Sequence, residues 1–384
     1  MKQTVKCLTS LIRSVITDEK IEYSEVFEER FDKIMRLANF HEVQPLAAAG
    51  FLNNGLLKDE KQIAKCRDAM IKASYMDSKN EFTCRKASDS LNSAQIPFIK
   101  LKGAVIKNLY PETFLRTSCD TDILVRKNDF NRALSALKSD GFEQDGKIGY
   151  HDVSLLFDGT NLELHFSICE NIKKIDALLK DIWKYTVKDG DYNYKEDNDY
   201  FAFHHIAHML YHFFEGGCGI RPFVDLWIMR RNEFYSEDKL LEFCEKTGMT
   251  EFYSAAEQLI SVWFQNGNHT ELTEMFERFI LKGGAYGNFK NSSVVKSAKN
   301  GGKLGYIMLL VFPKFASMQV SYPILRKVPV LLPLCYIYRF FEKIFGKKRN
   351  KAKYRYEMVR NHNDDKIKEA ERLIKELKLG GRKK

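Results

Sequence analysis

The feature that most constrains the fold is the confinement of strand-like segments to one part of the chain, residues 96–190. Before this part, apolar residues recur at spacings of three and four, as in Phe27, Phe31 and Ile34, which is the period of amphipathic helices. The helical period returns over about residues 200–279, and no repeat at a solenoid period appears. This pattern predicts an α+β fold in which a small sheet domain is flanked by N- and C-terminal helical regions.

The chain of 384 residues has room for two or three domains and a substantial core. Its content of 44% apolar and 29% charged residues excludes a disordered or low-complexity protein. We expect an N-terminal helical region, an α/β core, a helical region that closes a cleft, and an apolar arm with a basic C-terminal helix. In order, these are residues 1–95, 96–190, 191–299 and 300–384.

Cysteines and the N-terminus indicate the compartment. The eight cysteines are scattered singly without a C-x-x-C pair, so neither a disulfide framework nor a zinc ribbon is expected. Polar residues such as Thr4, Ser10 and Arg13 interrupt the apolar residues of the N-terminus, so no signal-peptide core forms. We therefore expect a cytoplasmic protein whose first segment is a helix.

The net charge of +10 lies entirely at the C-terminus. Residues 343–384 carry 16 Lys and Arg against 6 Asp and Glu, which leaves 45 of each sign in residues 1–342. The neutral body and the lack of a recognition motif argue against a nucleic-acid enzyme.

Within the central part, Pro97 precedes a short strand that ends at the Lys102-Gly103 turn, and a helix follows over residues 104–109. A second strand is expected at residues 120–125 and a helix at about 128–139. Residues 151–157 and 161–168 then form a predicted hairpin around Asp158-Gly159-Thr160.

Paired carboxylates carry the chemical hypothesis. Because side chains alternate along a strand, Asp120 and Asp122 project from one face and Thr121, Ile123 and Val125 from the other. Two adjacent carboxylates repel each other unless a cation intervenes, and such hard oxygen ligands suit Mg²⁺ completed by substrate phosphates. The alternative is a solvated strand end whose acids cap a turn.

Further residues favour the functional interpretation. Alternation places Glu163, His165 and Ser167 on one face of the hairpin strand, which adds a third acid. Upstream, Gly103 allows backbone N–H groups to approach an anion such as a triphosphate, and Lys102 supplies positive charge.

At this point the sequence resembles a known family. The order of strand, glycine turn, helix, Asp-x-Asp strand and later acidic strand looks like the polymerase-beta-type nucleotidyltransferases. Over residues 30–270 it is more closely similar to the bacterial uncharacterised nucleotidyltransferase family, whose members often accompany genes for surface-polysaccharide synthesis. The segments that carry this resemblance are Leu101-Lys102-Gly103, Leu109-Tyr110-Pro111, Arg116, Asp120-Thr121-Asp122-Ile123-Leu124-Val125, Gly141-Phe142 and Glu163-Leu164-His165.

The resemblance implies a two-metal nucleotidyl-transfer site that uses Mg²⁺, with Mn²⁺ as the alternative. Asp120 and Asp122 would be metal ligands, and Glu163 would be the third carboxylate near the acceptor. Nucleotide binding would fall to the residues Lys102, Gly103 and Arg116. Gly103 is followed by Ala104 where the superfamily usually has a serine or glycine, which leaves the triphosphate contacts open. For Arg116 the alternative is a surface arginine paired with Asp120 or Glu112.

A histidine stripe follows on a predicted helix. His204, His208 and His212 are four residues apart and lie on one face, but the glutamate of an H-E-x-x-H protease motif is absent. The close family also has an arginine and an aspartate shortly afterwards, which match Arg221 and Asp225. Three interpretations stay open for the histidines, namely cleft lining, helix packing and a transition-metal site. The candidates to line the cleft are His165, His204, His208, His212, Arg221 and Asp225.

The C-terminal part is both apolar and basic. Residues 304–312 and 328–341 are the most apolar runs, and Pro313, Pro323 and Pro333 are among the residues that interrupt them, so we do not expect a membrane span. Aromatic side chains beside many lysines suit an anionic membrane surface, so residues 300–384 are expected to bind one peripherally. The alternative is an arm packed on the body.

The leading hypothesis is a Mg²⁺-dependent transfer of a nucleoside monophosphate from a nucleoside triphosphate to a small-molecule, glycan or lipid-linked acceptor, with release of pyrophosphate. The alternative is a non-catalytic nucleotide-binding or scaffold protein of a membrane-associated glycan pathway, which the Gly103-Ala104 pair favours.

Overall fold

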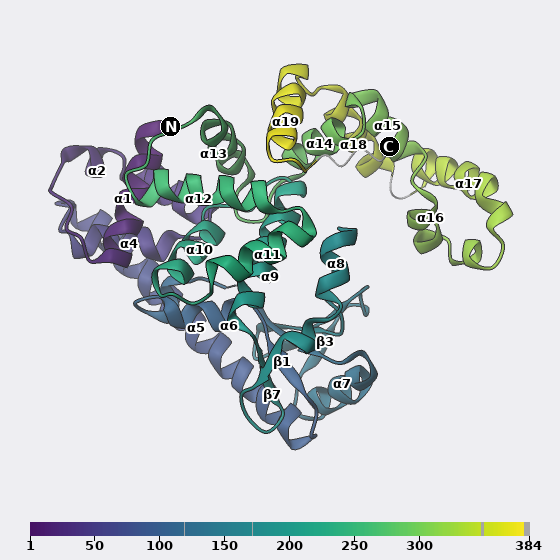
Figure 1. The fold of residues 1–384 in the computed structure, drawn as a ribbon, viewed down its shortest axis with the longest axis horizontal. Coiled ribbons are helices and arrows are strands. Elements are labelled where there is room, and N and C mark those ends of the chain that lie inside the picture. Colours follow the sequence, from purple (N-terminus) through teal and green to yellow (C-terminus); the bar gives the residue numbers. More distant parts are fainter. Residues whose placement is uncertain (119, 171, 347–348, 380–384) are drawn as a thin grey trace. The chain divides into compact units, whose positions relative to one another are not determined.

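The computed structural model describes residues 1–118, 120–170, 172–346 and 349–379. Contacts divide the chain into two compact units, which Figure 1 shows coloured along the sequence. Unit 1 comprises residues 1–211 and 218–285, and unit 2 comprises residues 212–217 and 286–384.

Unit 1 begins with helices, as the apolar spacing predicted. They are α1 (Lys2–Thr17), α2 (Glu25–Glu29), α3 (Phe31–Phe40), α4 (Gln44–Asn53) and α5 (Glu60–Ser93). The long helix α5 starts at a capped end, since the Asp59 side chain accepts a hydrogen bond from the backbone N–H of Lys61.

One seven-stranded sheet follows, so the fold is a mixed α+β fold, as predicted. Its strands are β1 (Phe98–Lys100), β2 (Asp120–Val125), β3 (Glu143–Asp145), β4 (Asp152–Phe157), β5 (Thr160–His165), β6 (Thr186–Lys188) and β7 (Asn193–Glu196). The order across the sheet is β3-β4-β5-β2-β1-β7-β6. Strand β2 therefore lies in the middle, antiparallel to β1 and parallel to β5.

The predicted hairpin is confirmed, with a shorter loop than expected. Strands β4 and β5 are antiparallel and Phe157 pairs with Thr160, so Thr160 belongs to the strand. The two-residue turn consists of Asp158 and Gly159, with φ angles of 48° and 72°. Two successive positive φ angles match the right-handed twist of a hairpin, and aspartate followed by glycine is a favoured pair for such a turn.

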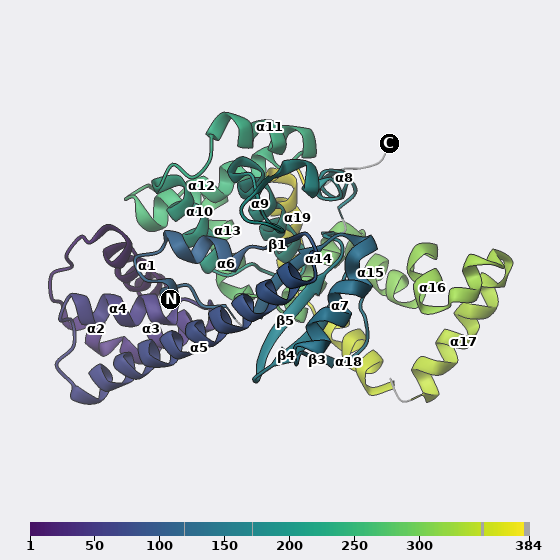
Figure 2. The same cartoon turned by 90° about the horizontal axis from the view of Figure 1, so that it is seen from below.

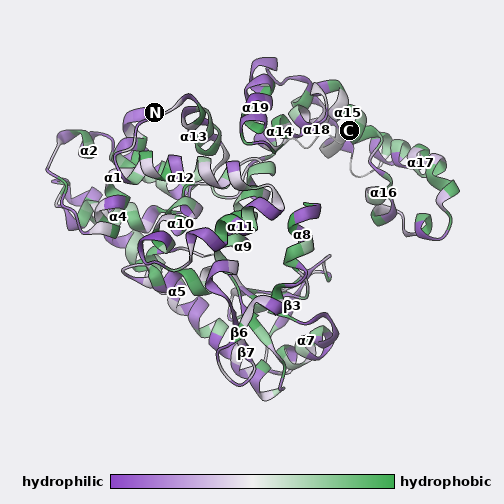
Figure 3. Cartoon of the chain, viewed as in Figure 1, coloured by the Kyte–Doolittle hydropathy of each residue, from purple (hydrophilic) through white to green (hydrophobic). Residues whose placement is uncertain are grey.

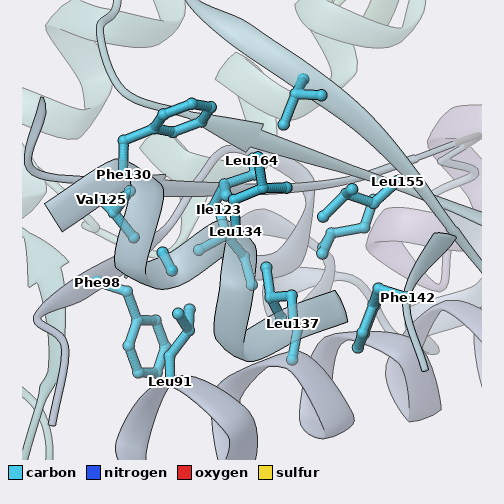
Figure 4. Close-up of a cluster of buried hydrophobic side chains, with 14 of the residues drawn as sticks. Leu91, Phe98, Ile123, Val125, Phe130, Leu134, Leu137, Phe142, Leu155 and Leu164 are labelled. Atoms are coloured by element: carbon cyan, nitrogen blue, oxygen red, sulfur yellow. The ribbon is translucent and has the colours of Figure 1, made fainter. Parts of the chain in front are cut away.

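A hydrophobic core lies on one face of the sheet. Side chains of α5 and of α7 (Phe130–Ser139) pack against the strands, and Figure 4 shows Leu91, Phe130 and Leu137 converging on Ile123 and Leu164. Figure 2 shows α5 running along this side with α7 beside it. The inward positions of β2 and β5 are thus the apolar positions that alternation predicted.

Two parts of the sheet were not predicted. Strand β3 is short and carries Glu143 and Asp145, so it lacks the apolar alternation of a half-buried strand. Strand β6 was not predicted either, and β7 extends the sheet beyond residue 190 and pairs in parallel with β1. Strands thus concentrate in residues 96–190, as expected, except for β7, whose pairing depends on a distant neighbour.

The remaining helices of unit 1 come after strand β1 in the chain. Besides α7 they are α6 (Gly103–Ile106), α8 (Lys173–Leu179), α9 (Asn198–Phe214), α10 (Arg221–Arg231), α11 (Glu237–Thr247), α12 (Thr250–Phe264) and α13 (Glu271–Gly283). Helix α9 belongs to unit 1 up to Tyr211 and to unit 2 from His212.

Unit 2 is helical in its described residues. Its helices are α14 (Phe289–Lys299), α15 (Gly302–Val311), α16 (Phe315–Ser321), α17 (Leu332–Phe345), α18 (Arg349–Arg360) and α19 (Asp364–Glu376). A small core forms where Val294 of α14 meets Ile367 and Ala370 of α19. Figure 3 shows how hydrophobic residues are distributed over α15, α16 and α17.

Among the described residues, one stretch is long and apolar enough to cross a membrane by length and composition, Gly302–Ser321. In the structure this stretch is two helices, since α15 ends at Val311 and α16 begins at Phe315 after Pro313.

Candidate functional site

The polar face of the sheet, opposite the core, collects the predicted acids. Strands β2 and β5 run parallel with Asp122 opposite Glu163 in the register. Because both strands turn their apolar alternate residues into the core, Asp120, Asp122, Glu163 and His165 share the other face. The prediction that Glu163 lies on the same side as the two aspartates is thereby confirmed.

His165 connects the acids of the two strands. Its Nε2 lies 2.9 Å from Asp122 Oδ1 and 3.4 Å from Glu163 Oε2. Desolvation lowers the pKa of His165, but hydrogen bonds with Asp122 and Glu163 outweigh it and raise this pKa to about 9. The same hydrogen bond holds the pKa of Asp122 well below its usual value in spite of burial. A positively charged imidazolium thus lies between two carboxylates at neutral pH.

Asp120 is compensated less well. The hydroxyl of Ser118 lies 3.4 Å from Asp120 Oδ1. Burial raises the pKa of Asp120 to about 6, and repulsion from Asp122 and Glu163 acts in the same direction. Ionising this carboxylate beside the other two therefore costs free energy, as expected at a site that is completed by a cation.

Lys102 faces this acidic group. Burial lowers the pKa of its ammonium, but the field of Asp122, followed by that of Glu170 and Asp120, outweighs burial and raises this pKa. The backbone of Lys102 has a φ of 43°, which is uncommon for a residue with a side chain. Such local strain is typical of functional sites, and here it turns the chain between β1 and α6.

Gly103 is required by packing against an arginine. A Cβ at this position would lie 2.6 Å from Nη1 of Arg116 and 3.3 Å from Oγ of Ser118. Any larger residue would push the guanidinium away, so the glycine sets the distance between the turn and Arg116.

Arg116 forms a buried ion pair. Its Nε and Nη2 donate to the two carboxylate oxygens of Asp225, each at 3.0 Å, and the hydroxyl of Tyr110 donates to Asp225 at 2.7 Å. Arg116 is 8% exposed and Asp225 is 0% exposed. The alternative of a surface arginine paired with Asp120 or Glu112 was therefore wrong. Asp225 does not line an open cleft, because it is enclosed by the groups that neutralise it.

Arg221 lies at the start of α10 and connects two other segments. Its Nη1 is 2.9 Å from Glu42 Oε2 and donates to the backbone oxygen of Thr117 at 3.0 Å. It therefore anchors the chain just before β2, and its charge also lowers the pKa of Asp120 to a small extent.

The histidines of α9 differ in their surroundings. His208 is half-buried, and its Nδ1 lies 2.9 Å from Glu170, a residue whose pKa is lowered by the histidine in spite of burial. His204 is 1% exposed and pairs with Glu196 at 3.0 Å, so the expectation that it lines an open cleft was wrong. His212 belongs to unit 2 and packs edge-on against Tyr286.

Two sets of side chains have the geometry of metal ligands within the described residues. Asp122, Glu163 and His165 form one set, and His151, Asp152 and His165 form the other, with all ligand atoms of a set within 4.8 Å of one another. Asp120 belongs to neither set, although it lies on the same face. The stripe of His204, His208 and His212 is not among them either, so nothing in this part of the chain supports a separate transition-metal site there.

Sequence reasoning missed three carboxylates that hold the site residues. Glu170, Glu196 and Glu42 pair with His208, His204 and Arg221 over separations of 38, 8 and 179 positions. The sequence offers no signal for such partners, since Glu196 lies among the polar residues Lys195, Asp197 and Asn198 and no motif connects it with His204.

No curated protein and no solved structure matches the chain. A family model described as uncharacterised nucleotidyltransferase matches residues 28–265, which is more than half of the chain and contains the whole polar face of the sheet. The chain therefore belongs to this uncharacterised nucleotidyltransferase family.

Proposed function

We propose that the protein transfers a nucleoside monophosphate from a nucleoside triphosphate to an acceptor hydroxyl and releases pyrophosphate. The observation that carries this proposal is the convergence of Asp122, Glu163 and His165 beside Asp120, within a chain of the nucleotidyltransferase family. The order of β1, the Lys102-Gly103 turn, the Asp-x-Asp strand β2 and the acidic strand β5 supports a polymerase-beta-type core.

A divalent cation fits the residues present. Asp120, Asp122 and Glu163 offer carboxylate oxygens on one face of the sheet, and the pKa of Asp120 is raised by burial and then by repulsion from Asp122 and Glu163, which a cation would offset. Asp120 and Asp122 would hold the Mg²⁺ of the nucleotide, and Glu163 would complete the ligands on the acceptor side, with Mn²⁺ as the alternative. When bound, the metal neutralises the charge that develops on the transferring phosphoryl group.

The residues of the chain then have separate tasks. The acceptor oxygen forms a bond to the α-phosphorus while the bond from that phosphorus to the bridging oxygen breaks, and pyrophosphate departs. Glu163 accepts the proton of the acceptor hydroxyl. Lys102 offers a half-buried ammonium to the negative charge of the nucleotide. Arg116 supports the turn, because its guanidinium packs beside Gly103 and is held in place by the ion pair with Asp225.

The acceptor class stays broad in this proposal. A small molecule, a glycan or a lipid-linked acceptor agrees with a neutral body, and nucleic acid does not. A role in surface-polysaccharide synthesis is part of the same proposal, as is a cytoplasmic location, which the scattered single cysteines of the sequence support.

Nucleotide binding with and without metal tests the proposal. We expect full-length protein to bind ATP or another nucleoside triphosphate only with Mg²⁺ or Mn²⁺, and Asp120→Asn and Asp122→Asn to abolish this binding while the protein stays folded. The matched control is Asp145→Asn, an exposed acid at the edge strand β3 of the same sheet. Metal-dependent binding that survives in both site variants would refute the assignment.

The same experiment separates the enzyme from a non-catalytic nucleotide-binding or scaffold protein. The Gly103-Ala104 pair favours that alternative, because Ala104 lacks a hydroxyl that contacts phosphate. A screen of acceptors then measures whether pyrophosphate is released from the bound nucleotide. If nucleotide binds but no acceptor class leads to pyrophosphate release, the non-catalytic alternative is favoured.

A further inference from the structure

The segment of residues 302–345, here called the arm, is built unlike the rest of the chain. It contains α15, α16 and α17, yet its only buried apolar residues are Tyr306, Met318 and Leu325. Sixteen large apolar side chains of the arm are exposed, among them Leu304 at 78% and Phe345 at 76%. Helices this apolar are normally buried, so an exposed surface of this kind marks an interaction site.

Most of the arm belongs to a longer stretch whose charges are all positive. Residues 286–341 contain eight lysines and arginines and no aspartate or glutamate. Glu342 is the first acid after this stretch, and the described part of α18 adds the cations of Arg349, Lys353 and Arg355. A partner for this surface must be apolar in one part and anionic in another.

A cavity of ≈ 330 Å³ within unit 2 combines both properties. Apolar side chains of α15 and α17 line one part of it. Its cationic lining residues are Arg339, Lys343, Arg349, Lys353 and Arg355, and no acidic residue is among the described lining residues. Arg355 lies over the ring of Phe289, and Lys353 forms an exposed ion pair with Glu357 of the same helix at 3.8 Å.

We propose that the arm binds in the plane of an anionic phospholipid bilayer, with a lipid phosphate in this cationic cavity and the exposed apolar side chains among the acyl chains. Charge complementarity selects the lipid, because the described lining of the cavity combines five cationic side chains with apolar ones and includes no acidic residue. The helices are too short to cross, since ten residues of α15 span about 15 Å of a hydrocarbon core about 30 Å thick. This inference does not depend on nucleotidyl transfer.

Vesicle co-sedimentation of the full-length protein tests the inference. We expect binding to vesicles of phosphatidylcholine mixed with phosphatidylglycerol, much weaker binding to phosphatidylcholine alone, and release by high salt, because screening weakens the attraction between the cations and the headgroups. Glycerol phosphate added as a soluble competitor should not release the protein, since it offers no acyl chains.

Two pairs of substitutions separate the contributions. Arg349→Gln with Lys353→Gln should weaken binding about fivefold for each charge, which corresponds to about 1 kcal/mol per charge. Phe341→Ser with Phe345→Ser should weaken it roughly tenfold for each ring. The matched controls lie on α5 of unit 1, where Lys61→Gln with Arg67→Gln and Ile71→Ser with Tyr75→Ser remove exposed side chains of the same kinds and should leave binding unchanged.

Four results would overturn the inference. Equal binding to neutral and anionic vesicles would remove the role of the cations, and release by glycerol phosphate would make the cavity a site for soluble phosphates. Protein that stays with vesicles in high salt and at alkaline pH until detergent is added would show that Gly302–Ser321 spans the bilayer. Oligomers that form without lipid and disappear in the Phe341→Ser, Phe345→Ser variant would show that a second copy covers the arm.

Discussion

The two faces of strands β2 and β5 differ in chemistry and in their effect on stability. On β2 and β5, Ile123 and Leu164 face a dry core with helices α5 and α7, and both side chains are fully buried. One residue away in each strand, Asp122 and Glu163 face the polar site. The core face gains stability from apolar burial, whereas the polar face holds like charges together and loses stability. A one-residue shift in register would exchange these roles, so the core determines the geometry of the site.

This comparison predicts that changes on the two faces separate activity from stability. A change on the polar face should alter ligand binding or turnover and leave folding intact. A change on the core face should lower the free energy of unfolding and reach the site only through the fold.

The largest effect is expected on turnover, at Glu163. Glu163→Gln keeps the shape of the side chain but removes the group that accepts the acceptor proton, so turnover should fall by about 10²–10⁴-fold. Nucleotide binding should change much less, because we assign the triphosphate to other residues. Single-turnover kinetics and equilibrium binding on the same preparation measure both quantities.

The control for this prediction is Asp152→Asn, which changes a carboxylate on the neighbouring strand β4. Its turnover should stay within a few-fold of the unchanged protein. A loss as large as that of Glu163→Gln would instead place the metal at His151, Asp152 and His165, the second set of potential ligands.

The next effect concerns the charged pair that supports the turn beside the site. Asp225→Ala leaves the guanidinium of Arg116 buried without its partner, which should lower the free energy of unfolding by about 3–5 kcal/mol. Urea unfolding of the purified protein measures this loss. Replacing both partners with apolar residues, Arg116→Met with Asp225→Leu, should recover part of it. A double variant as unstable as the single one would show that Arg116 serves another partner.

On the core face, Leu164→Ala should lower the free energy of unfolding by about 3 kcal/mol, since a fully buried leucine leaves a cavity. Metal-dependent nucleotide binding should persist at temperatures where the variant is still folded. Leu156→Ala is the control. This side chain lies on the adjacent strand and is 38% exposed, so its truncation should lower the free energy of unfolding far less. A loss of binding in folded Leu164→Ala would contradict the separation between the two faces.

How far the sequence predicted this arrangement depends on the range of the interactions. Alternation in β2 and β5 placed Asp120, Asp122 and Glu163 correctly, because the period of a strand is a local property. The Asp158-Gly159 turn was recognisable for the same reason. The parallel pairing of β2 with β5 and of β1 with β7 was not predicted, because it depends on hydrogen bonds between segments distant in sequence.

Partners of buried charges were the least predictable part. Arg116 was expected to contact nucleotide or a nearby acid, yet it pairs with Asp225, which lies 109 positions away. Burial decides such pairs, since a guanidinium removed from water needs a carboxylate in bidentate geometry. The local sequence around Arg116 contains no information about where that carboxylate comes from.

The smallest effect concerns a buried histidine beside this ion pair and its dependence on pH. Desolvation lowers the pKa of His205 to about 4, and its Nε2 lies 2.9 Å from the backbone oxygen of Pro222. The unfolded chain, with an ordinary histidine pKa of about 6.5, binds a proton more readily than the folded protein does. Stability should therefore be intact above pH 6.5, fall as the pH drops from 6.5 towards 4, and lose on the order of 1 kcal/mol from this residue at pH 5.5. Urea unfolding between pH 5 and 8.5 measures the loss, and subtracting the curve of His205→Gln removes the contributions of other groups.

The difference in the free energy of unfolding between the two proteins should be constant above pH 7.5 and should change in favour of the variant below pH 6.5. A difference that stays constant down to pH 5 would show that His205 accepts its proton inside the fold.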